Sequence, residues 1–361
     1  MRKYAAREFL SEIDSVISFD DILLVPSYSN IRSRMDPDIS TSLSEDFRLA
    51  LPVISSPMHT VTDSAMASSM ASSGGLGVIH RFMTKEEQRN SAITCYDSAG
   101  ENSVALAIGV GDSERDRFRY LYNEIGELLS WAVIDVANGH SEYARDMIRW
   151  ILDESGGSVN IMAGNVATKE GFRYLADAGA NSVRVGIGGG SICKTRIMTG
   201  FGVPTISSVL DCHSISDEYP SVSIVADGGI RYPADLVKCL AAGASAVMVG
   251  GILSGTIECP GDVLTDDSGV KYKRYRGMAS EEVQIDRRGG LKSGTCAEGV
   301  STKVPFKGSV QDVLREFSGG LRSAMTYSNS RSVEHLRDNA RFVRITASSI
   351  EESHAFGTRN K

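Results

Sequence analysis

Residues 183–199 organise the sequence: Val-Arg-Val-Gly-Ile-Gly-Gly-Gly-Ser-Ile-Cys-Lys-Thr-Arg-Ile-Met-Thr. The alternating apolar residues Val183, Val185 and Ile187 predict a short buried strand. The three consecutive glycines that follow let the backbone approach a ligand closely, so that the amides after the strand can face an anion. We therefore expect the chemistry of this protein to begin where this strand ends.

Two side chains behind the glycines have a chemical use. Ser191 offers a hydroxyl to a phosphate, and Cys193 stands at the loop tip, where a thiol can act as a nucleophile. A thiol reacts as the thiolate, and Lys194, Arg196 and exposed amides are neighbours of the kind that lower a cysteine pKa. The alternative for this window alone is a glycine-rich loop with an inert, buried cysteine.

Composition limits the class of protein. A chain of 361 residues with 42% hydrophobic residues is large enough for an α/β barrel built as one domain. The net charge of −7 and the pI near 5.5 argue against partners such as nucleic acid or an anionic membrane. The six cysteines are scattered, without Cys-x-x-Cys pairs, and no apolar leader begins the chain. We therefore expect a cytoplasmic protein with reduced thiols.

Short apolar runs alternate with segments of helical periodicity along the chain. The apolar runs are residues 52–55, 76–79, 104–110, 131–136, 159–163, 182–187, 222–226 and 246–249, and the helical segments between them include 113–129, 142–152, 169–178 and 234–241. Gly179 and Gly243 each stand between a helical segment and the next run, the usual place of a helix-ending glycine. Eight alternating units predict a parallel sheet closed into a (β/α)8 TIM barrel.

The active site of such a barrel lies at the carboxyl ends of the strands, and the unusual residues of this chain follow the predicted strands. They are residues 56–58, 80–81, 135–140, 164–166, 188–196, 227–229 and 250–251. The late loops of a barrel commonly form a phosphate site, which the glycines after strands six, seven and eight fit. His80 and His140 are candidate acids or bases, although a lone histidine is more often structural. We expect the apolar run within residues 18–26 to plug one end of the barrel.

The regular alternation stops after the eighth strand. Residues 258–307 form a long irregular insertion, and loops of that length are usually functional. Residues 266–269, Asp-Asp-Ser-Gly, predict a hairpin turn within it, and Glu298 is its one carboxylate flanked by small residues. Helices at 310–317 and 333–339 and a tail at 341–361 follow. No linker marks a second domain, so residues 1–361 are expected to form one catalytic domain.

Several of these motifs together resemble the family of inosine monophosphate dehydrogenase and GMP reductase. The motifs are residues 19–26 (Phe-Asp-Asp-Ile-Leu-Leu-Val-Pro), 57–62 (Pro-Met-His-Thr-Val-Thr), 74–80 (Gly-Gly-Leu-Gly-Val-Ile-His), 188–196, 227–230 (Asp-Gly-Gly-Ile), 275–278 (Tyr-Arg-Gly-Met), 304–308 (Val-Pro-Phe-Lys-Gly) and 319–323 (Gly-Gly-Leu-Arg-Ser). The resemblance runs from Ser18 to about His354. It implies an oxidoreductase acting on a purine nucleoside monophosphate with a nicotinamide cofactor.

The resemblance also implies a role for each motif. The substrate would contact Ser56, Met58, Ser191, Asp227, Gly229, Gly250, Gly251, Tyr275, Gly277 and Met278. Among these, Ser191, Gly229, Gly250, Gly251 and Tyr275 would hold the phosphate, Asp227 the ribose and Met278 the purine. Cys193 would attack purine C2, with Thr195 and Glu298 as its proton-transfer partners. The cofactor would contact Asp135, Asn138, Gly139 and Arg196.

Two further properties follow from the resemblance alone. The backbone carbonyls of Gly188, Gly190 and Cys193 resemble a K+ site, to which residues 352–354 of a neighbouring subunit would contribute. Members of the family are usually tetramers, so a homotetramer is expected.

The insertion favours the reductase over the dehydrogenase. Dehydrogenases resembling this chain usually carry a pair of CBS modules between the second and third strands, for which residues 88–104 leave no room. They also use a long flap with an Arg-Tyr pair that activates water. Here Glu298 lies twenty positions after Met278, and no Arg-Tyr pair occurs between them. We therefore expect NADPH-dependent reduction of GMP to IMP and ammonia through a covalent intermediate on Cys193.

Three alternatives stay open. The first is an IMP dehydrogenase without CBS modules that uses NAD, with Arg287 or Arg288 in place of the missing arginine. The second is a reductase for a deoxynucleotide or another purine, because Thr295 stands where the reductases carry an arginine that contacts guanine. The third is a nucleotide-binding regulator without catalysis, against which the joint presence of Cys193, Thr195 and Glu298 argues.

Overall fold

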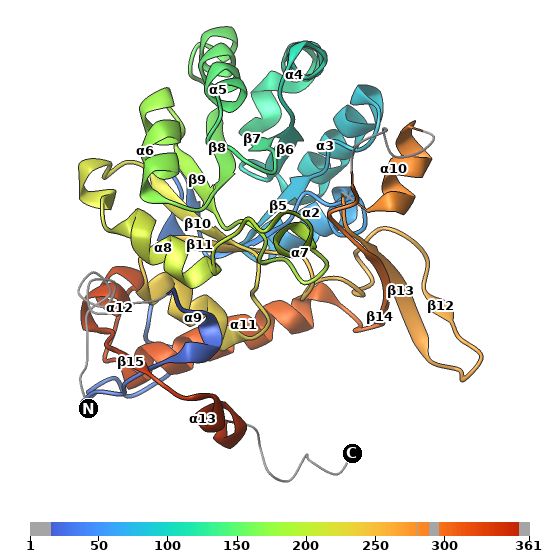
Figure 1. Cartoon of the computed structure of the whole chain (residues 1–361). Helices are drawn as coiled ribbons and strands as arrows, with labels where there is room; N and C mark the ends of the chain where they lie inside the picture. Colours follow the sequence, from blue (N-terminus) through green and yellow to red (C-terminus); the bar gives the residue numbers. More distant parts are fainter. Residues whose placement is uncertain (1–15, 279, 289–295, 354–361) are drawn as a thin grey trace.

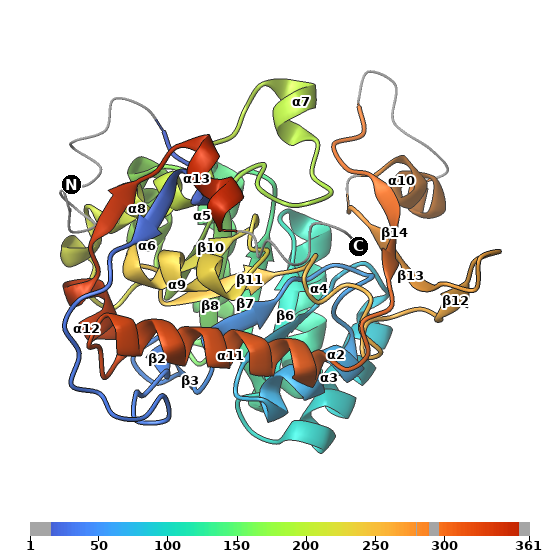
Figure 2. The same ribbon diagram turned by 90° about the horizontal axis from the view of Figure 1, so that it is seen from below.

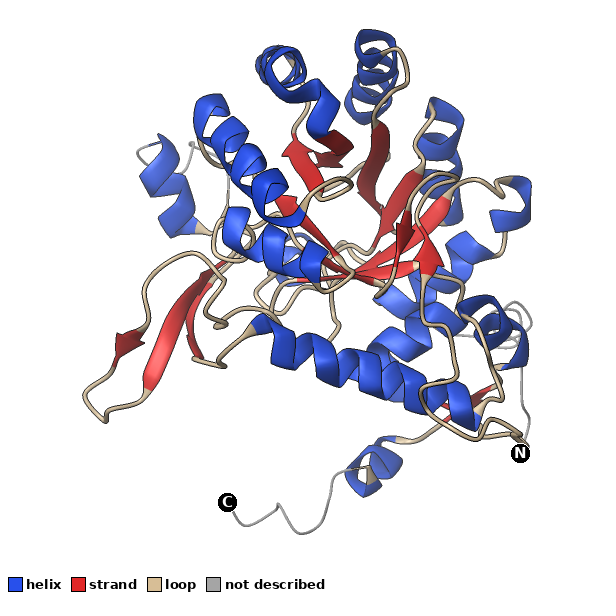
Figure 3. Cartoon of the chain, turned by 180° about the vertical axis from the view of Figure 1, so that it is seen from behind, coloured by secondary structure: helices blue, strands red, loops and turns tan. Residues whose placement is uncertain are grey.

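The computed structural model describes residues 16–278, 280–288 and 296–353. Eight parallel strands form a closed barrel in which β11 pairs with β4 and β9 pairs with β10. The strands are β4 (Val53–Ser55), β5 (Leu76–Ile79), β6 (Val104–Ile108), β7 (Leu129–Asp135), β8 (Asn160–Val166), β9 (Ser182–Val185), β10 (Ser223–Asp227) and β11 (Ala246–Val249). The strands lie at the centre and the helices surround them (Figures 1 and 3). The expected (β/α)8 barrel is confirmed.

The outer layer consists of helices that follow the strands. They are α2 (Ser64–Ser72), α3 (Lys85–Ala99), α4 (Asp112–Ile125), α5 (Glu142–Ser155), α6 (Lys169–Ala178), α8 (Thr205–His213), α9 (Pro233–Ala241), α11 (Val310–Tyr327) and α12 (Val333–Asn339). Local signals set their ends: the Thr168 hydroxyl caps α6, which ends at Gly179 with φ of 107°. None of the helices in the described ranges has the length and apolarity that a membrane crossing requires.

Helix α11 is longer than the sequence pattern predicts. The prediction of a helix over 310–317 is wrong at its C-terminal end, because α11 continues through Gly319 and Gly320 to Tyr327. A Cβ at Gly320 would lie 2.4 Å from Cβ of Pro233, so this glycine lets α11 pack closely against the start of α9. The apolar face of the helix also continues beyond the glycines with the buried Leu321 and Met325. Tertiary packing thus outweighs the weak helix propensity of glycine.

The plug of the barrel is a different segment from the one expected. A hairpin of β2 (Thr41–Ser42) and β3 (Arg48–Leu49) contributes Leu43, Phe47 and Leu49 to the apolar cluster inside the barrel. The Phe47 ring meets the ring of Trp131 edge-on, with centroids 5.5 Å apart. Ser223, the first residue of β10, donates to the Leu43 carbonyl, which places the hairpin at the amino ends of the strands.

The segment that was expected to plug the barrel lies outside the strands. The 3-10 turn η1 (Phe19–Asp21) and β1 (Ile22–Leu24) run beside α8 and α9, and β1 pairs with β15 (Phe342–Arg344). The buried Lys238 donates to the Phe19 carbonyl at 2.9 Å. A Cβ at Gly229 would lie 3.3 Å from the Phe19 ring, so the segment supports the loop after β10 from outside.

The insertion after β11 forms a small antiparallel sheet of its own. It contains β12 (Leu264–Thr265), β13 (Lys271–Arg276) and β14 (Ser301–Pro305), and the predicted turn at 266–269 joins the first two strands. Figure 2 shows this sheet extending from one side of the barrel, with helix α10 (Glu281–Arg288) close to it. A short helix, α13 (Ala347–Glu352), follows β15 near the end of the described chain.

The aromatic contact in the plug should be important for stability. Replacing the buried Phe47 with Ala removes the ring that packs on Trp131 and should lower the free energy of unfolding by about 3 kcal/mol. Replacing Tyr28, which is 84% exposed, with Ala is the matched control and should leave the urea midpoint unchanged. Equal urea midpoints for both variants would show that the hairpin does not stabilise the barrel.

Candidate active site

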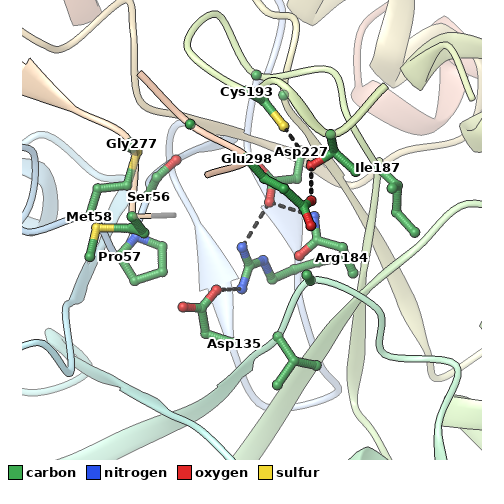
Figure 4. A pocket seen from close by; sticks show the side chains of 18 of the residues that line it. Ser56, Pro57, Met58, Asp135, Arg184, Ile187, Cys193, Asp227, Gly277 and Glu298 are labelled. Atoms are coloured by element: carbon green, nitrogen blue, oxygen red, sulfur yellow. Dashed lines mark hydrogen bonds and ion pairs between the residues drawn. The ribbon is translucent and has the colours of Figure 1, made fainter. Parts of the chain in front are cut away.

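A cavity of about 760 Å³ opens at the carboxyl ends of the barrel strands, large enough for a nucleotide. Its lining includes twelve of the residues predicted from the sequence: Ser56, Met58, Asp135, Gly188, Gly190, Cys193, Thr195, Asp227, Tyr275, Gly277, Met278 and Glu298. Figure 4 shows the side chains of Cys193, Glu298, Arg184, Asp135 and Asp227 gathered in this cavity. The barrel therefore brings together groups from loops far apart in the sequence.

Cys193 begins a chain of hydrogen bonds. Its thiol donates to the Thr195 hydroxyl, with Sγ and Oγ1 3.2 Å apart, and Thr195 donates to Oε2 of Glu298 at 2.7 Å. Thr195 is the first residue of the short helix α7 (Thr195–Thr199), and Glu298 comes from the insertion. A thiol, a hydroxyl and a carboxylate in this order can pass a proton between the sulfur and the carboxylate.

The backbone fixes the relative position of these groups. Lys194 N–H donates to the Glu298 carbonyl at 2.7 Å, and Val300 N–H donates to the Ile192 carbonyl at 3.1 Å. The loop after β9 and the returning end of the insertion therefore form a short antiparallel bridge at Cys193. These two hydrogen bonds hold the backbone of Glu298 beside the loop that carries Thr195.

A buried arginine lies beneath the thiol and joins two carboxylates. Arg184 on β9 has a side chain only 5% exposed, and its guanidinium lies 3.0 Å from Oδ1 of Asp135 and 2.8 Å from Oδ2 of Asp227. Burial opposes the positive charge, but Asp227 and Asp135 outweigh burial and raise the pKa of Arg184. The arginine therefore stays charged and holds both carboxylates in position.

Asn165 on β8 completes this network. Its amide donates to Oδ2 of Asp227 at 2.8 Å and to the Gly186 carbonyl at 2.8 Å. Because Arg184 and Asn165 both use Oδ2, the other oxygen of Asp227 is left to accept hydrogen bonds from a ligand. Sequence patterns placed Asn165 at the carboxyl end of a predicted strand without a specific role, and gave Arg184 no role in the site. The position of Arg184 between two valines of a predicted strand could have revealed its role, because a charge inside a barrel strand needs buried partners.

Of the residues predicted to hold the phosphate, Tyr275 lines the cavity, whereas Ser191, Gly229, Gly250 and Gly251 do not. A Cβ at Gly251 would lie 2.6 Å from Oγ of Ser191, and one at Gly250 would lie 3.1 Å from the Tyr275 hydroxyl. Burial raises the pKa of Tyr275 to about 12, so its phenol stays a neutral hydrogen-bond donor near neutral pH. Gly229 lies nearby, where its Cβ would be 3.5 Å from the Gly189 carbonyl.

The other end of the cavity carries a second group of charges. Arg81 lies 3.9 Å from Asp135 and 3.8 Å from Glu114, and its guanidinium stacks over the Phe82 ring. Glu114 also accepts the N–H of Gly109 at 2.7 Å. All four side chains line the cavity, so Arg81, Phe82 and Glu114 join Asp135 at the end predicted to face the nicotinamide.

The other predicted cofactor residues, Asn138, Gly139 and Arg196, do not line the cavity. Gly139 N–H donates to the Asn165 carbonyl, and Asn138 caps the turn by accepting from His140 N–H. The Arg196 guanidinium donates to the carbonyls of Ile187 and Val203, which braces the loop from behind. The role of these residues in cofactor binding stays a prediction.

The predicted cation site consists of backbone carbonyls. The Gly190 carbonyl accepts from Cys193 N–H at 3.1 Å, whereas those of Gly188 and Cys193 accept no hydrogen bond within the described part of the chain. Two oxygens of the loop are thus available for a cation. His354, which resembles the contribution of a neighbouring subunit, lies outside the described residues, as does Thr295.

The two candidate histidines have structural contacts. His80 is 6% exposed and accepts the N–H of Phe82, while the His140 ring lies 5.0 Å from that of Tyr174. Neither lines the cavity. These contacts fit the structural alternative for both histidines.

Four of the six cysteines are buried, as expected for thiols that form no motif in the sequence. Cys95, Cys212, Cys239 and Cys259 are buried, and burial raises the pKa of each of these thiols. Buried thiols with raised pKa values are poor nucleophiles. Cys193 is partly exposed and is the cysteine that lines the cavity.

Loss of the buried arginine should affect stability strongly. Arg184→Met leaves Asp135 and Asp227 without their shared partner and should lower the free energy of unfolding by about 3 kcal/mol. Arg119→Gln is the matched control, because its two hydrogen bonds to Glu154 lie on the surface. Urea unfolding should show a lower midpoint for the first variant alone, and a stable Arg184→Met protein would contradict the proposed network.

Comparison with known proteins agrees with this geometry. The sequence model of the IMP dehydrogenase / GMP reductase domain matches residues 16–356. The chain is 37% identical to an inosine-5′-monophosphate dehydrogenase from Cryptosporidium parvum, with 94% of each protein covered. It is 29% identical to a GMP reductase from Leishmania major, covering 97% of this chain and 98% of that protein.

A solved structure has the same fold over nearly the whole chain. It is a GMP reductase from Trypanosoma brucei, with one cysteine replaced by alanine, in complex with guanosine 5′-monophosphate. Its TM-score is 0.87 at 27% sequence identity, and the match covers 96% of this chain and 99% of that one. This oxidoreductase barrel therefore belongs to the IMP dehydrogenase / GMP reductase family.

Proposed function

We propose that this protein is a GMP reductase, which converts GMP to IMP and ammonia with NADPH. The observation that carries the proposal is the chain of hydrogen bonds from Cys193 through Thr195 to Glu298. Release of ammonia from purine C2 needs both a sulfur nucleophile and a proton for the leaving nitrogen. The hydroxyl and carboxylate beside the thiol can supply that proton.

The first step forms a covalent bond between the enzyme and the purine. The Cys193 thiolate adds to C2 of GMP, and the C2–N bond breaks as the amino group takes a proton from Thr195 and Glu298 and leaves as ammonia. The product is a thioimidate on Cys193. Asp227, held by Arg184 and Asn165, would accept hydrogen bonds from the ribose and so align C2 with the sulfur.

The second step releases the base. The hydride that C2 needs would come from bound NADPH. Cys193 would then leave as the thiolate when the C–S bond breaks, with IMP as the product. The residues that fit a nicotinamide lie around Asp135 at the end of the cavity away from the glycines. Asp135 is fixed there by Arg184 and Arg81, and can accept a hydrogen bond from the carboxamide of the ring.

A second candidate is IMP oxidation to XMP with NAD. The dehydrogenase from Cryptosporidium parvum is 37% identical to this chain, against 29% for the Leishmania major reductase. Hydrolysis of the intermediate would require an activated water, and residues 279–297 contain no tyrosine. Arg287 and Arg288 belong to α10, and their side chains lie outside what the structure describes. The missing Arg-Tyr pair favours the reductase.

We also propose that residues 1–361 form a single catalytic domain that assembles as a homotetramer. The chain passes from α3 to β6 through residues 100–103, which leaves no space for a module between them. The exposed Ile197, Met198 and Phe201 on and after α7 are apolar groups that a second copy would cover.

A K+ ion bound to carbonyls of the loop after β9 would order that loop beside the thiol.

Nicotinamide absorbance at 340 nm tests the reaction in both directions. With GMP as substrate, we expect the protein to oxidise NADPH and to release ammonia and IMP. The same assay with dGMP tests the alternative substrate that Thr295 suggests. IMP with NAD and K+ should give no sustained NADH. Formation of XMP would contradict the reductase and favour the dehydrogenase, and binding of GMP without any turnover would favour a regulator.

Variants of the hydrogen-bonded chain test the mechanism. Cys193→Ala should reduce kcat by at least about 1,000-fold, because the covalent step is lost. Glu298→Gln should reduce kcat by about 100-fold, because the amide cannot supply the proton. Cys95→Ala, at a buried thiol on α3, is the control and should keep full activity.

Single-turnover measurements on the wild-type protein and the Cys193→Ala variant test whether ammonia leaves before the hydride is transferred. If the thioimidate forms before hydride transfer, the wild-type enzyme should release ammonia from GMP in a single turnover without NADPH. Cys193→Ala should release none. Wild-type turnover in the Cys193→Ala variant would rule out the covalent mechanism.

A further inference from the structure

Lys307 contacts the loop after β11, which contains Gly250 and Gly251, through the carbonyl oxygens of that loop. It follows β14 in the chain, and its ammonium donates to the carbonyls of Gly251 at 3.1 Å and Ile252 at 3.0 Å. The Ser254 hydroxyl also donates to the Gly251 carbonyl, at 2.7 Å. Two donors therefore hold one peptide group of the loop that is expected to receive the phosphate.

The orientation of that peptide has a direct consequence for its amide. In a trans peptide the C=O and N–H groups point in opposite directions, so donors on the Gly251 carbonyl fix the direction of the Ile252 N–H. Within the described residues, no hydrogen bond uses the N–H groups of Gly250, Gly251 or Ile252. These amides are therefore available to an anion on the side of Ser191.

The charge of Lys307 strengthens the same peptide. A cation on the carbonyl oxygen polarises the peptide dipole and makes the N–H at its other end a better donor. The Lys307 side chain is exposed to solvent on one side, its partial burial on the other lowers the pKa of the ammonium, and among the described residues no carboxylate forms an ion pair with it. Its positive charge is therefore not neutralised beside the loop.

The backbone holds Lys307 in this place. Its N–H donates to the Gly255 carbonyl at 2.9 Å, and Ile257 N–H donates to the Gly308 carbonyl at 2.8 Å. The insertion thus returns to the barrel directly beneath the loop after β11, and the lysine is placed by both neighbouring segments. A side chain needed only for solubility would not be fixed in this way.

We propose that Lys307 is a positioning residue for the 5′-phosphate of the nucleotide. It acts through the Gly251 carbonyl, which turns the Ile252 N–H toward the phosphate, and its ammonium adds positive charge beside that peptide. This inference rests on the proposed function, in which Gly250 and Gly251 receive the phosphate. It adds a charged group to a site otherwise made of amides and hydroxyls.

Calorimetric titration of Lys307→Met with IMP and with inosine tests the proposal. The two ligands differ only in the phosphate, and binding is measured without turnover. We expect the Kd for IMP to rise about tenfold and the Kd for inosine to stay within twofold of the wild-type value. Lys307→Arg keeps the charge and should keep the Kd for IMP within threefold.

The matched control is Lys303→Met, which removes a lysine of β14 that lies over the Tyr272 ring. It should bind IMP with the wild-type affinity. Equal losses of affinity for IMP and inosine in Lys307→Met would show a general structural role and overturn the proposal. An unchanged Kd for IMP would also overturn it, as would a Lys307→Arg variant that binds IMP as weakly as Lys307→Met. Failure of the wild-type protein to bind IMP or GMP would instead contradict the proposed function.

Discussion

The ion pairs of Arg184 with Asp135 and Asp227 are the interaction on which the site depends. A guanidinium has a planar fork that can bind two carboxylates at once, and here it joins β7 to β10 through β9. Both carboxylates face the cavity, with side chains 20% and 15% exposed, and the shared guanidinium offsets the charge of each where access to water is limited. The same contacts fix which oxygen of Asp227 remains for a ligand, so stability and function rest on the same atoms.

Around this centre, the chain builds the two ends of the cavity by different means. The end with Ser191, Gly250 and Gly251 relies on backbone amides that are exposed because glycines admit close approach. The end with Asp135 relies on side-chain charge, since Arg81 and Glu114 surround it. In the proposed function, the first end would receive the phosphate of the substrate and the second the nicotinamide ring.

The reactive thiol lies where the barrel and the insertion meet. Cys193 belongs to a barrel loop and Glu298 to the insertion, more than one hundred positions later, and two backbone hydrogen bonds keep the segments together. The insertion returns beneath the loop after β11 through Lys307. It therefore contacts both Cys193 and the predicted phosphate end, so its short length bears directly on the choice between the two proposed reactions.

Local sequence patterns were enough to predict the eight strands, the glycines that follow helices and many of the residues that line the cavity. These features depend on local periodicity, backbone conformation and short motifs. Tertiary structure decided the rest. The plug is formed by Phe47 rather than residues 18–26, and α11 passes through Gly320, because each outcome depends on which distant surface is available for burial. The roles of Arg184 and Lys307 were hidden for the same reason: a charge has meaning only beside partners that folding brings to it.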